Sequence, residues 1–311
     1  PVGSRGTALG GNFIASISGV EAMHWNPAGV AASPYRAELM ASHFRYIADI
    51  NVEYAAVAAK FNGVGSFGLN IRTLDFGDIP VTTELATEGT GELFSPTFVT
   101  VGLTFSRQMT DRIFFGTTAK IITEGILDQS ASGVAFDFGL QYSTGVGGLK
   151  IGIALKNLGP NMKFDGSETE TRVAPAGTEP GTRARNLRQP LATFELPSTL
   201  ELGLSYDIGV SDKAKVTVAG NFMNNNFGLD QYGLAGEFNF DKKIFLRGGY
   251  TLAYNPDNEK FLGSEEEFLF GPSAGAGVAL DIGSFNVLLD YAYRATEFFD
   301  SNQWFTLTLG F

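Results

Sequence analysis

Two short glycine motifs have the spacing of motifs that support chemistry in other proteins. Gly63 to Gly68, GVGSFG, matches the GxGxxG loop that holds a dinucleotide pyrophosphate at a helix N-terminus. Gly271 to Gly275, GPSAG, matches the GxSxG turn that presents a nucleophilic serine. Both motifs need a helix directly after them, whereas the segments that continue them, LNIRTL and GAGVALDI, read as strands. We therefore predict no catalytic residue, no cofactor-binding residue and no cofactor.

The histidines and carboxylates make no recognisable catalytic or metal site. His24 and His43 both precede GPSAG, so its serine has no later base, and neither has metal-ligand neighbours. The chain has no cysteine, which excludes thiolate ligands. Residues 75–95 are acidic without a basic residue, but they lack a Ca²⁺-loop spacing and favour a solvated acidic face. We predict a protein that is not an enzyme and that holds no metal.

Several charged residues occupy alternate positions within otherwise apolar segments. We predict that they point to the inside of a barrel, where mixed signs neutralise one another and hydrogen-bond an internal segment. The alternative is a selectivity filter that lines an open pore. The predicted lumen-facing charges are Lys120, Glu124, Asp137, Lys156, Glu201, Glu237, Arg247, Asp290 and Arg294.

The elements that carry these charges alternate with a period of two residues. In VAFDFGLQY, residues 134–142, large apolar side chains form one face, and Ala, Asp, Gly and Gln form the other. A soluble β-sandwich also alternates, but its polar face is rich in Lys, Glu and Thr. Here the second face is small and mixed, which is typical of the lumen of a transmembrane barrel.

The alternation predicts an all-β transmembrane antiparallel barrel of about 14 strands. Connections after even-numbered strands are tight, and most of those after odd-numbered strands are long, including 75–95, 125–130, 158–195 and 255–270. This asymmetry favours a bacterial outer-membrane barrel with both termini in the periplasm. The predicted strands are 36–46, 50–61, 63–74, 96–107, 111–124, 131–143, 147–157, 196–209, 213–223, 230–240, 242–254, 271–282, 284–295 and 302–311.

The last strand, NQWFTLTLGF, ends on an aromatic residue. We predict that Phe305, Leu307, Leu309 and Phe311 face lipid and serve as the C-terminal signal of the barrel-assembly machinery. The chain begins at Pro1, from which we expect that a signal peptide has been removed. A net charge of −11 argues against nucleic acid as a partner. The expected location is the outer membrane of a Gram-negative bacterium.

Residues 1–35 do not alternate, and residues 36–311 form the predicted barrel. Asn26, Pro27, Ala28 and Gly29 read as a capped turn, because Asn26 can cap the turn and proline suits a first helical position. The segment is either loose in the periplasm or folded into the lumen. Its low charge favours a plug inside the lumen, which a barrel of this size has room to hold.

The chain resembles the PorV/PorQ family of FadL-like outer-membrane barrels. The resemblance rests on VGSRGTALGGNFIASISGVEAMHWNPAGVA, DIPVTTE, TDRIFFGTTAKIITEGI, GVAFDFGLQY and KIGIALKNLGPNMKF. It implies a fourteen-stranded barrel with an N-terminal plug. Members of this family serve type IX secretion, where a PorV-like protein binds the C-terminal domain of exported cargo. The wider FadL-like group moves hydrophobic molecules through the barrel wall.

These observations support two principal functional hypotheses. The first is a non-catalytic scaffold or shuttle of a type IX-like system that docks a secretion subunit or a cargo C-terminal domain through extracellular loops. The second is a transporter of hydrophobic small molecules such as fatty acids, which needs an apolar pocket beside the plug and a lateral opening. GAGVALDIG, residues 275–283, is glycine-dense enough to supply the opening. An open porin is a third possibility, and the plug counts against it.

Overall fold

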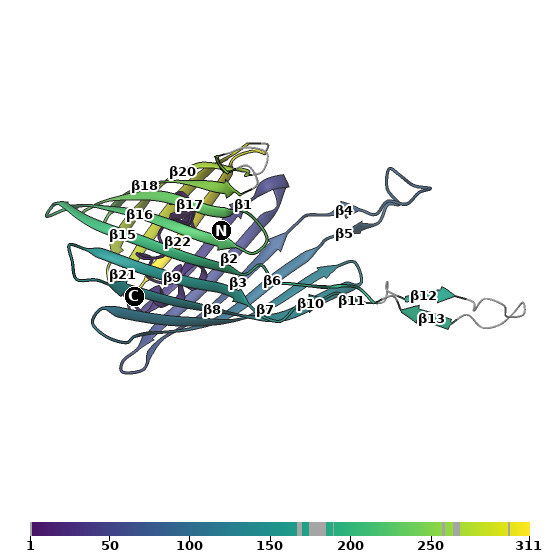
Figure 1. The fold of residues 1–311 in the computed structure, drawn as a ribbon, viewed down its shortest axis with the longest axis horizontal. Helices are drawn as coiled ribbons and strands as arrows, with labels where there is room; N and C mark the ends of the chain where they lie inside the picture. Colours follow the sequence, from purple (N-terminus) through teal and green to yellow (C-terminus); the bar gives the residue numbers. More distant parts are fainter. Residues whose placement is uncertain are drawn as a thin grey trace, which may run out of the picture.

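The computed structural model describes residues 2–166, 170–173, 185–188, 190–256, 259–263, 268–297 and 299–311. Figure 1 shows one barrel from which a few strands project at one end. Among these residues, no helix combines the length and the apolar character needed to cross a membrane. The loop residues Asp257, Glu265, Glu266 and Glu267 lie outside the described part of the chain.

Fourteen of the described strands close into one antiparallel barrel, which confirms the predicted fold class. The first strand pairs with the last, from Glu38 opposite Gly310 to Arg45 opposite Gln303. Closure gives every barrel strand a paired neighbour on each side, as a hydrocarbon environment requires. The strands are β1 (Ala37–Arg45), β2 (Asn51–Phe61), β3 (Gly65–Asp75), β6 (Thr97–Gln108), β7 (Ile113–Ile126), β8 (Gln129–Ser143), β9 (Leu149–Leu158), β15 (Thr199–Ser211), β16 (Ala214–Asn225), β17 (Asp230–Phe240), β18 (Ile244–Asn255), β20 (Phe270–Ile282), β21 (Phe285–Thr296) and β22 (Asn302–Gly310).

The two ends of the barrel differ as the connections predict. The short turns, such as 62–64 and 283–284, lie at one end together with the C-terminus (Figure 1). The long connections lie at the other, which we call the long-loop end. One predicted long connection, 125–130, is wrong, because β7 and β8 continue to Ile126 and Gln129 and leave a two-residue turn. The β-branched Ile126 extends the ladder beyond the predicted strand end.

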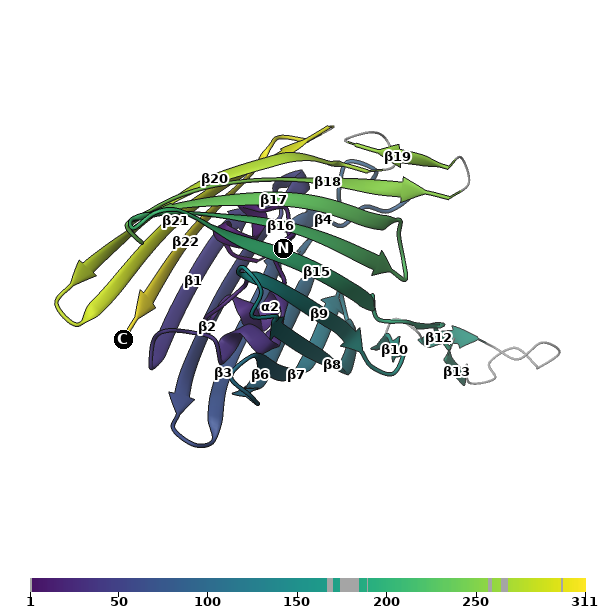
Figure 2. The ribbon, with the colours of Figure 1, turned by 60° about the vertical axis from the view of Figure 1, so that its left-hand side comes forward.

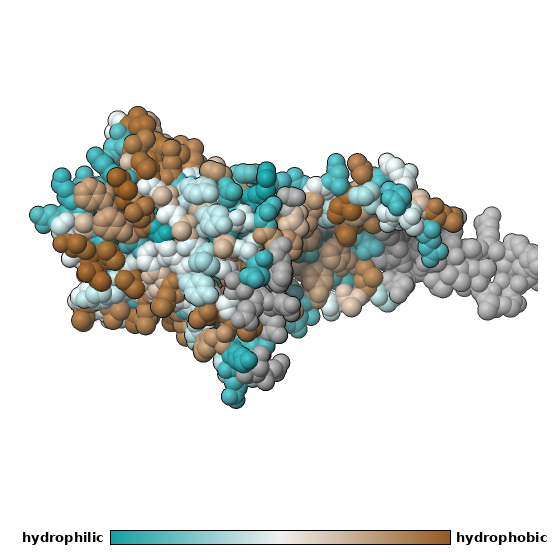
Figure 3. Space-filling view, turned by 90° about the horizontal axis from the view of Figure 1, so that it is seen from above, coloured by the Kyte–Doolittle hydropathy of each residue, from teal (hydrophilic) through white to brown (hydrophobic). Residues whose placement is uncertain are grey.

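The outer face of the barrel is apolar. Figure 3 shows apolar residues spread over the wall, with hydrophilic residues gathered at turns and loops. On the closing strand, Phe305 is 56% exposed and Phe311 is 40% exposed, whereas Trp304 between the lipid-facing positions is fully buried. Large apolar side chains that point outward and small or polar ones that point inward are the reverse of a soluble barrel.

Short strands extend the wall at the long-loop end, where Figure 1 shows two arms. One arm is the ribbon of β4 (Ile79–Pro80) and β5 (Leu93–Phe94), and the other holds β12 (Glu170–Val173) and β13 (Arg185–Arg188). Met162 and Leu196 beside the second arm are buried against Ala131 and Ala135 of β8, so this connection folds partly into the mouth. The remaining short strands are β10 (Met162–Lys163), β11 (Asp165–Gly166), β14 (Thr193–Phe194) and β19 (Lys260–Leu262).

The N-terminal segment, residues 2–33, lies inside the barrel (Figure 2). It forms α1 (Ser4–Ala8), α2 (Ala22–Trp25) and the 3-10 turn η1 (Pro27–Val30), and none of its residues is exposed. Its apolar side chains, among them Phe13 and Trp25, form one buried cluster with inward residues of the wall such as Met40 and Tyr54. The segment therefore supplies the core that the lumen of this barrel would otherwise lack. A second 3-10 turn, η2 (Ile47–Asp49), joins β1 to β2.

Candidate functional site

Inward-facing glycines of the wall make room for the N-terminal segment. A Cβ atom on Gly139 would lie 2.1 Å from Oδ1 of Asn26, and one on Gly116 would lie 2.3 Å from the carbonyl of Pro27. Glycines of six further strands meet the segment in the same way. They are Gly68, Gly152, Gly203, Gly233, Gly249 and Gly275. Because only hydrogen fits at these positions, the segment rests directly on the backbone of the wall.

The predicted turn at Asn26 joins the N-terminal segment to two strands. The Asn26 side chain accepts a hydrogen bond from the Ala28 amide at 3.2 Å, which caps η1. Its Nδ2 donates to the carbonyl oxygens of Ile14, Leu140 and Ile153 at 3.0, 3.2 and 3.3 Å. Ile153 and Leu140 face each other across β9 and β8. The fully buried amide therefore ties the turn to the wall as well as to the segment.

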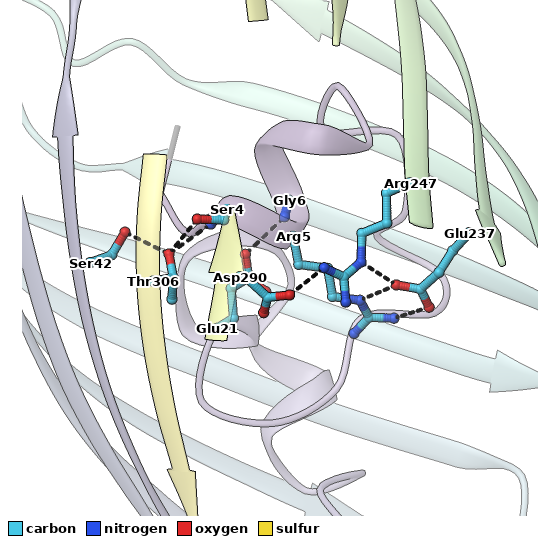
Figure 4. A network of polar contacts seen from close by, with 9 residues as sticks. All are labelled: Ser4, Arg5, Gly6, Glu21, Ser42, Glu237, Arg247, Asp290 and Thr306. Atoms are coloured by element: carbon cyan, nitrogen blue, oxygen red, sulfur yellow. Dashed lines mark hydrogen bonds and ion pairs between the residues drawn. The ribbon is translucent and has the colours of Figure 1, made fainter. Parts of the chain in front are cut away.

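Helix α1 is held by a buried charge network (Figure 4). Arg5 donates two hydrogen bonds to Glu237, at 2.9 and 3.0 Å. Arg247 donates to the same carboxylate at 2.7 Å and also pairs with Asp290. On the other side of the helix, the Ser4 amide donates to Thr306 at 2.9 Å, and this hydroxyl also contacts Ser42. Ser42 and Thr306 belong to the two strands that close the barrel.

The nine predicted lumen-facing charges are all buried or partly buried, and most are paired. Beside the network around Arg247, Lys120 pairs with Asp137 at 2.7 Å, and Lys156 pairs with Glu201. Arg294 lies over the ring of Phe270 at 4.2 Å. Glu124 has no ion pair or hydrogen bond with any described residue. Their assignment as a functional set stays a prediction.

Glu21 makes the stability of the folded N-terminal segment depend on pH. Its Oε1 accepts a hydrogen bond from the Gly6 amide at 2.9 Å, and burial raises the pKa of the carboxyl to about 7. A raised pKa means that the folded state favours the protonated form. This contribution to stability is complete below about pH 4.5 and is lost as pH rises through about 7.

We predict that Glu21→Gln removes part of the pH dependence of unfolding. Wild-type stability should fall between pH 5 and pH 8 relative to that of the variant, by on the order of 3 kcal/mol at most. Urea unfolding in lipid vesicles at several pH values measures this difference. Parallel pH profiles for the two proteins would contradict it.

Two adjoining hollows, which together we call the mouth cavity, lie above the N-terminal segment at the long-loop end. Their volumes are about 310 and about 220 Å³, and they share Arg72, Thr100, Ile122 and Glu124. The smaller one is mainly apolar, with Phe44, Val52, Leu74 and Phe98 in its lining. Met23 and His24 of α2 lie against the larger one, beside the Lys120–Asp137 pair. Burial, followed by nearby positive charges, lowers the pKa of His24 well below 6.5, so its imidazole is neutral there.

Unsatisfied polar atoms point to this cavity. Tyr54 and Arg72 are direct cross-strand neighbours on β2 and β3. The Tyr54 hydroxyl and the Arg72 Nε are both buried and have no hydrogen-bond partner among the described residues. Buried polar atoms that lack a hydrogen-bond partner are rare in folded proteins, so a partner for these two is expected. The prediction from sequence missed Arg72, although Gly68, Asn70 and Arg72 alternate along one face of a predicted strand.

Two other hollows differ from the mouth cavity. One of about 510 Å³ lies below the N-terminal segment at the short-turn end, with Arg5, Lys150 and Lys215 in its lining, so the segment separates two compartments of the lumen. The other, of about 750 Å³, is a concave patch on the outer wall over β2, β1, β22 and β21. His43 and Glu53 form an exposed pair at this patch. Because it faces away from the lumen, we do not place the site there.

The glycine motifs have structural roles. Gly63 and Gly65, with φ angles of 78° and 144°, form the turn into β3, and a strand follows them. Ser273 of GPSAG donates to the carbonyl oxygens of Ala8 and Gly249, at 3.0 and 3.1 Å. Each motif is therefore followed by strand, which lacks the helix N-terminus that either chemistry needs.

Solved structures with the same fold include proteins named as a hydrocarbon channel, a toluene transporter and a FadL homologue. The P. putida toluene transporter TodX covers 100% of this chain and 98% of its own, with 12% identity and a TM-score of 0.59. The CymD monoaromatic hydrocarbon channel covers 99% and 96%, with 14% identity and a TM-score of 0.57. A Pseudomonas aeruginosa FadL homologue covers 99% and 97%, with 10% identity and a TM-score of 0.57.

No protein-family model and no curated protein matches the sequence. At 10–14% identity, the likeness to the solved structures shows the fold alone. The chain therefore has the fold of the FadL-like barrels, as the sequence predicts. Its resemblance to the PorV/PorQ family remains a hypothesis.

Proposed function

We propose that this protein is an outer-membrane channel that takes up hydrophobic or amphiphilic small molecules. One observation carries the proposal: the mouth cavity, whose smaller hollow is mainly apolar, lies at the long-loop end, directly above a segment that fills the lumen. Such concave, mainly apolar hollows are typical of small-molecule sites. The names of the channels that share the fold support the same function. The long-loop end would then face the cell exterior, and both termini the periplasm.

A ligand that leaves the mouth cavity needs a way past the N-terminal segment. The ladder between β18 and β20 ends at Gly249 opposite Ser273, and β20 has a register shift between Phe270 and Ser273. Leu9 to Asn12 of the segment lie against this place, where Asn12 donates to the Tyr250 carbonyl at 3.3 Å. We propose this seam, in the glycine-dense strand, as the lateral exit.

We predict that a bulky side chain in the mouth cavity blocks uptake. Thr100 lines both hollows, so Thr100→Trp should reduce uptake of radiolabelled toluene and dodecanoate to the level of cells without the protein. The measurement uses a Gram-negative host that lacks channels of this fold. Val101→Trp, one residue along the same strand on the outer face, is the matched control and should leave uptake unchanged. Unchanged uptake in Thr100→Trp cells would contradict the proposal.

A scaffold role in type IX-like secretion is the second candidate. It is favoured by the β4–β5 arm, which projects from the barrel with Leu85 fully exposed and Leu93 60% exposed (Figure 1). Exposed apolar side chains on a projecting element suit contact with a protein. Co-purification of a secretion subunit or of a cargo C-terminal domain in mild detergent would support this role. For either function, we propose that the last strand, ending at Phe311, is read by the barrel-assembly machinery.

A further inference from the structure

The mouth cavity carries two charges of opposite sign that no described residue pairs. Within the described part of the chain, the Arg72 guanidinium hydrogen-bonds only to Thr100, at 3.5 Å, and its Nε has no partner. Glu124 makes no hydrogen bond or ion pair with the described residues. By contrast, Lys120 in the lining of the larger hollow and Arg247 below the N-terminal segment are each paired with carboxylates. Leaving a partly buried charge unpaired costs free energy, so the presence of two such charges of opposite sign in one cavity needs a reason.

The strand register sets the spacing of the two charges. Arg72 lies opposite Thr100, which lies opposite Ile122, and Glu124 is the next inward residue on the same strand as Ile122. The backbones of Arg72 and Glu124 are two strands apart, which is about 10 Å across the wall. Along the strand direction they are two residues apart, which is about 7 Å. The guanidinium contacts Thr100, which lies on the strand between them, and forms no ion pair with Glu124. Both side chains therefore face the cavity as separate charges.

The surface beside the two charges is apolar. Leu74, Phe98 and Ile122 line the smaller hollow together with Phe44 and Val52 at its far side. An apolar chain would lie against these residues without leaving polar atoms unsatisfied. The Tyr54 hydroxyl, beside Arg72, is free to donate to an anionic group held by the guanidinium.

We propose that the mouth cavity binds a zwitterionic amphiphile, a molecule with an apolar chain, one anionic group and one cationic group. The anionic group binds Arg72 and the Tyr54 hydroxyl, the cationic group binds Glu124, and the chain lies against Phe98 and Leu74. A hydrocarbon would bury both protein charges unpaired, and a simple carboxylate would neutralise only one. This inference rests on the proposed uptake function and names the class of molecule that the site prefers.

Isothermal titration of the purified full chain in a neutral detergent tests the proposal. The probes share a twelve-carbon chain: N-dodecyl-N,N-dimethylglycine is zwitterionic, dodecanoate is anionic, and dodecyltrimethylammonium is cationic. The wild type should bind the zwitterion at least about tenfold more tightly than either other probe, because one more charge is paired. Arg72→Gln and Glu124→Gln should each weaken zwitterion binding by about tenfold.

Two comparisons separate the roles of the charges. Glu124→Gln should not weaken dodecanoate binding, whereas Arg72→Gln should weaken it. Glu88→Gln, at an exposed carboxylate on the projecting arm, is the matched control and should change neither. Equal wild-type affinity for dodecanoate and the zwitterion, or no effect of Glu124→Gln, overturns the inference. With toluene uptake intact, that result leaves the proposed function standing. If the wild type binds none of the probes and takes up neither toluene nor dodecanoate, both the inference and the proposed function are overturned.

Discussion

Arg247→Ala is expected to destabilise the folded barrel by about 3–5 kcal/mol. The Arg247 side chain is 1% exposed and pairs with both Glu237 and Asp290, whose side chains are 9% and 3% exposed. Without the guanidinium, Asp290 keeps a buried negative charge and has no ion-pair partner among the described residues. Glu237 retains only Arg5, which comes from the N-terminal segment. The midpoint of urea unfolding in lipid vesicles measures the loss.

Two further variants distinguish a buried network from a general effect of charge. Arg107→Ala removes an exposed guanidinium from the outer side of β6 and should change stability by less than about 0.5 kcal/mol. The double variant Arg247→Leu with Asp290→Asn removes the charge together with its partner. It should be more stable than Arg247→Ala, because no unpaired carboxylate remains at that position. Equal losses in the double variant and in Arg247→Ala would contradict the network as the source of stability.

Gly139→Leu is expected to open the lumen to ions. Any Cβ at this position would lie 2.1 Å from Oδ1 of Asn26 and 2.8 Å from Cδ of Pro27. The backbone of β8 cannot move away from Asn26 without breaking its hydrogen bonds with β7 and β9, so the N-terminal segment has to move. Wild-type protein in planar bilayers should be closed, and the variant should show stable single-channel conductance, because an unfilled barrel of this size encloses an aqueous channel.

Gly236→Leu is the matched control for this prediction. Gly236 has open space where its Cβ would be and alternates with the inward Glu237, so the same substitution points to lipid. It should leave the channel closed. Heat-modifiable migration on gels shows whether each variant has folded, and trypsin cleavage after Arg5 reports displacement of the segment. A folded, closed Gly139→Leu barrel would show that the segment does not seal the lumen.

The sequence predicts the barrel well because its signal is local. In strands such as β8, residues two apart share a face. Large apolar residues therefore mark the face that points to lipid, and small residues mark the face that points to the lumen. Tight turns such as the one at Gly63 mark the strand ends. The one wrong connection, 125–130, arises because Ile126 and Gln129 fit a strand as well as a loop. The capped turn at Asn26 is likewise readable from neighbouring residues.

The contacts of the N-terminal segment depend on residues far apart in the chain. Arg5 lies 232 residues from Glu237, its ion-pair partner, and no short-range pattern connects them. Inward glycines such as Gly139 are visible in the sequence as small residues. That these glycines make room for the N-terminal segment follows only from where Asn26 and Pro27 lie in the closed barrel. The charge network and the glycine contacts therefore follow from the tertiary structure and not from a local sequence pattern.

The sequence by itself determines the alternating strands, the closed all-β barrel and the inward direction of most charges. Only the tertiary structure decides which inward charges find partners among the described residues, and which, such as Arg72 and Glu124, do not. The physical reason is that side-chain direction follows from a period of two along one strand. Pairing depends instead on register across several strands and on the segment that fills the space between them.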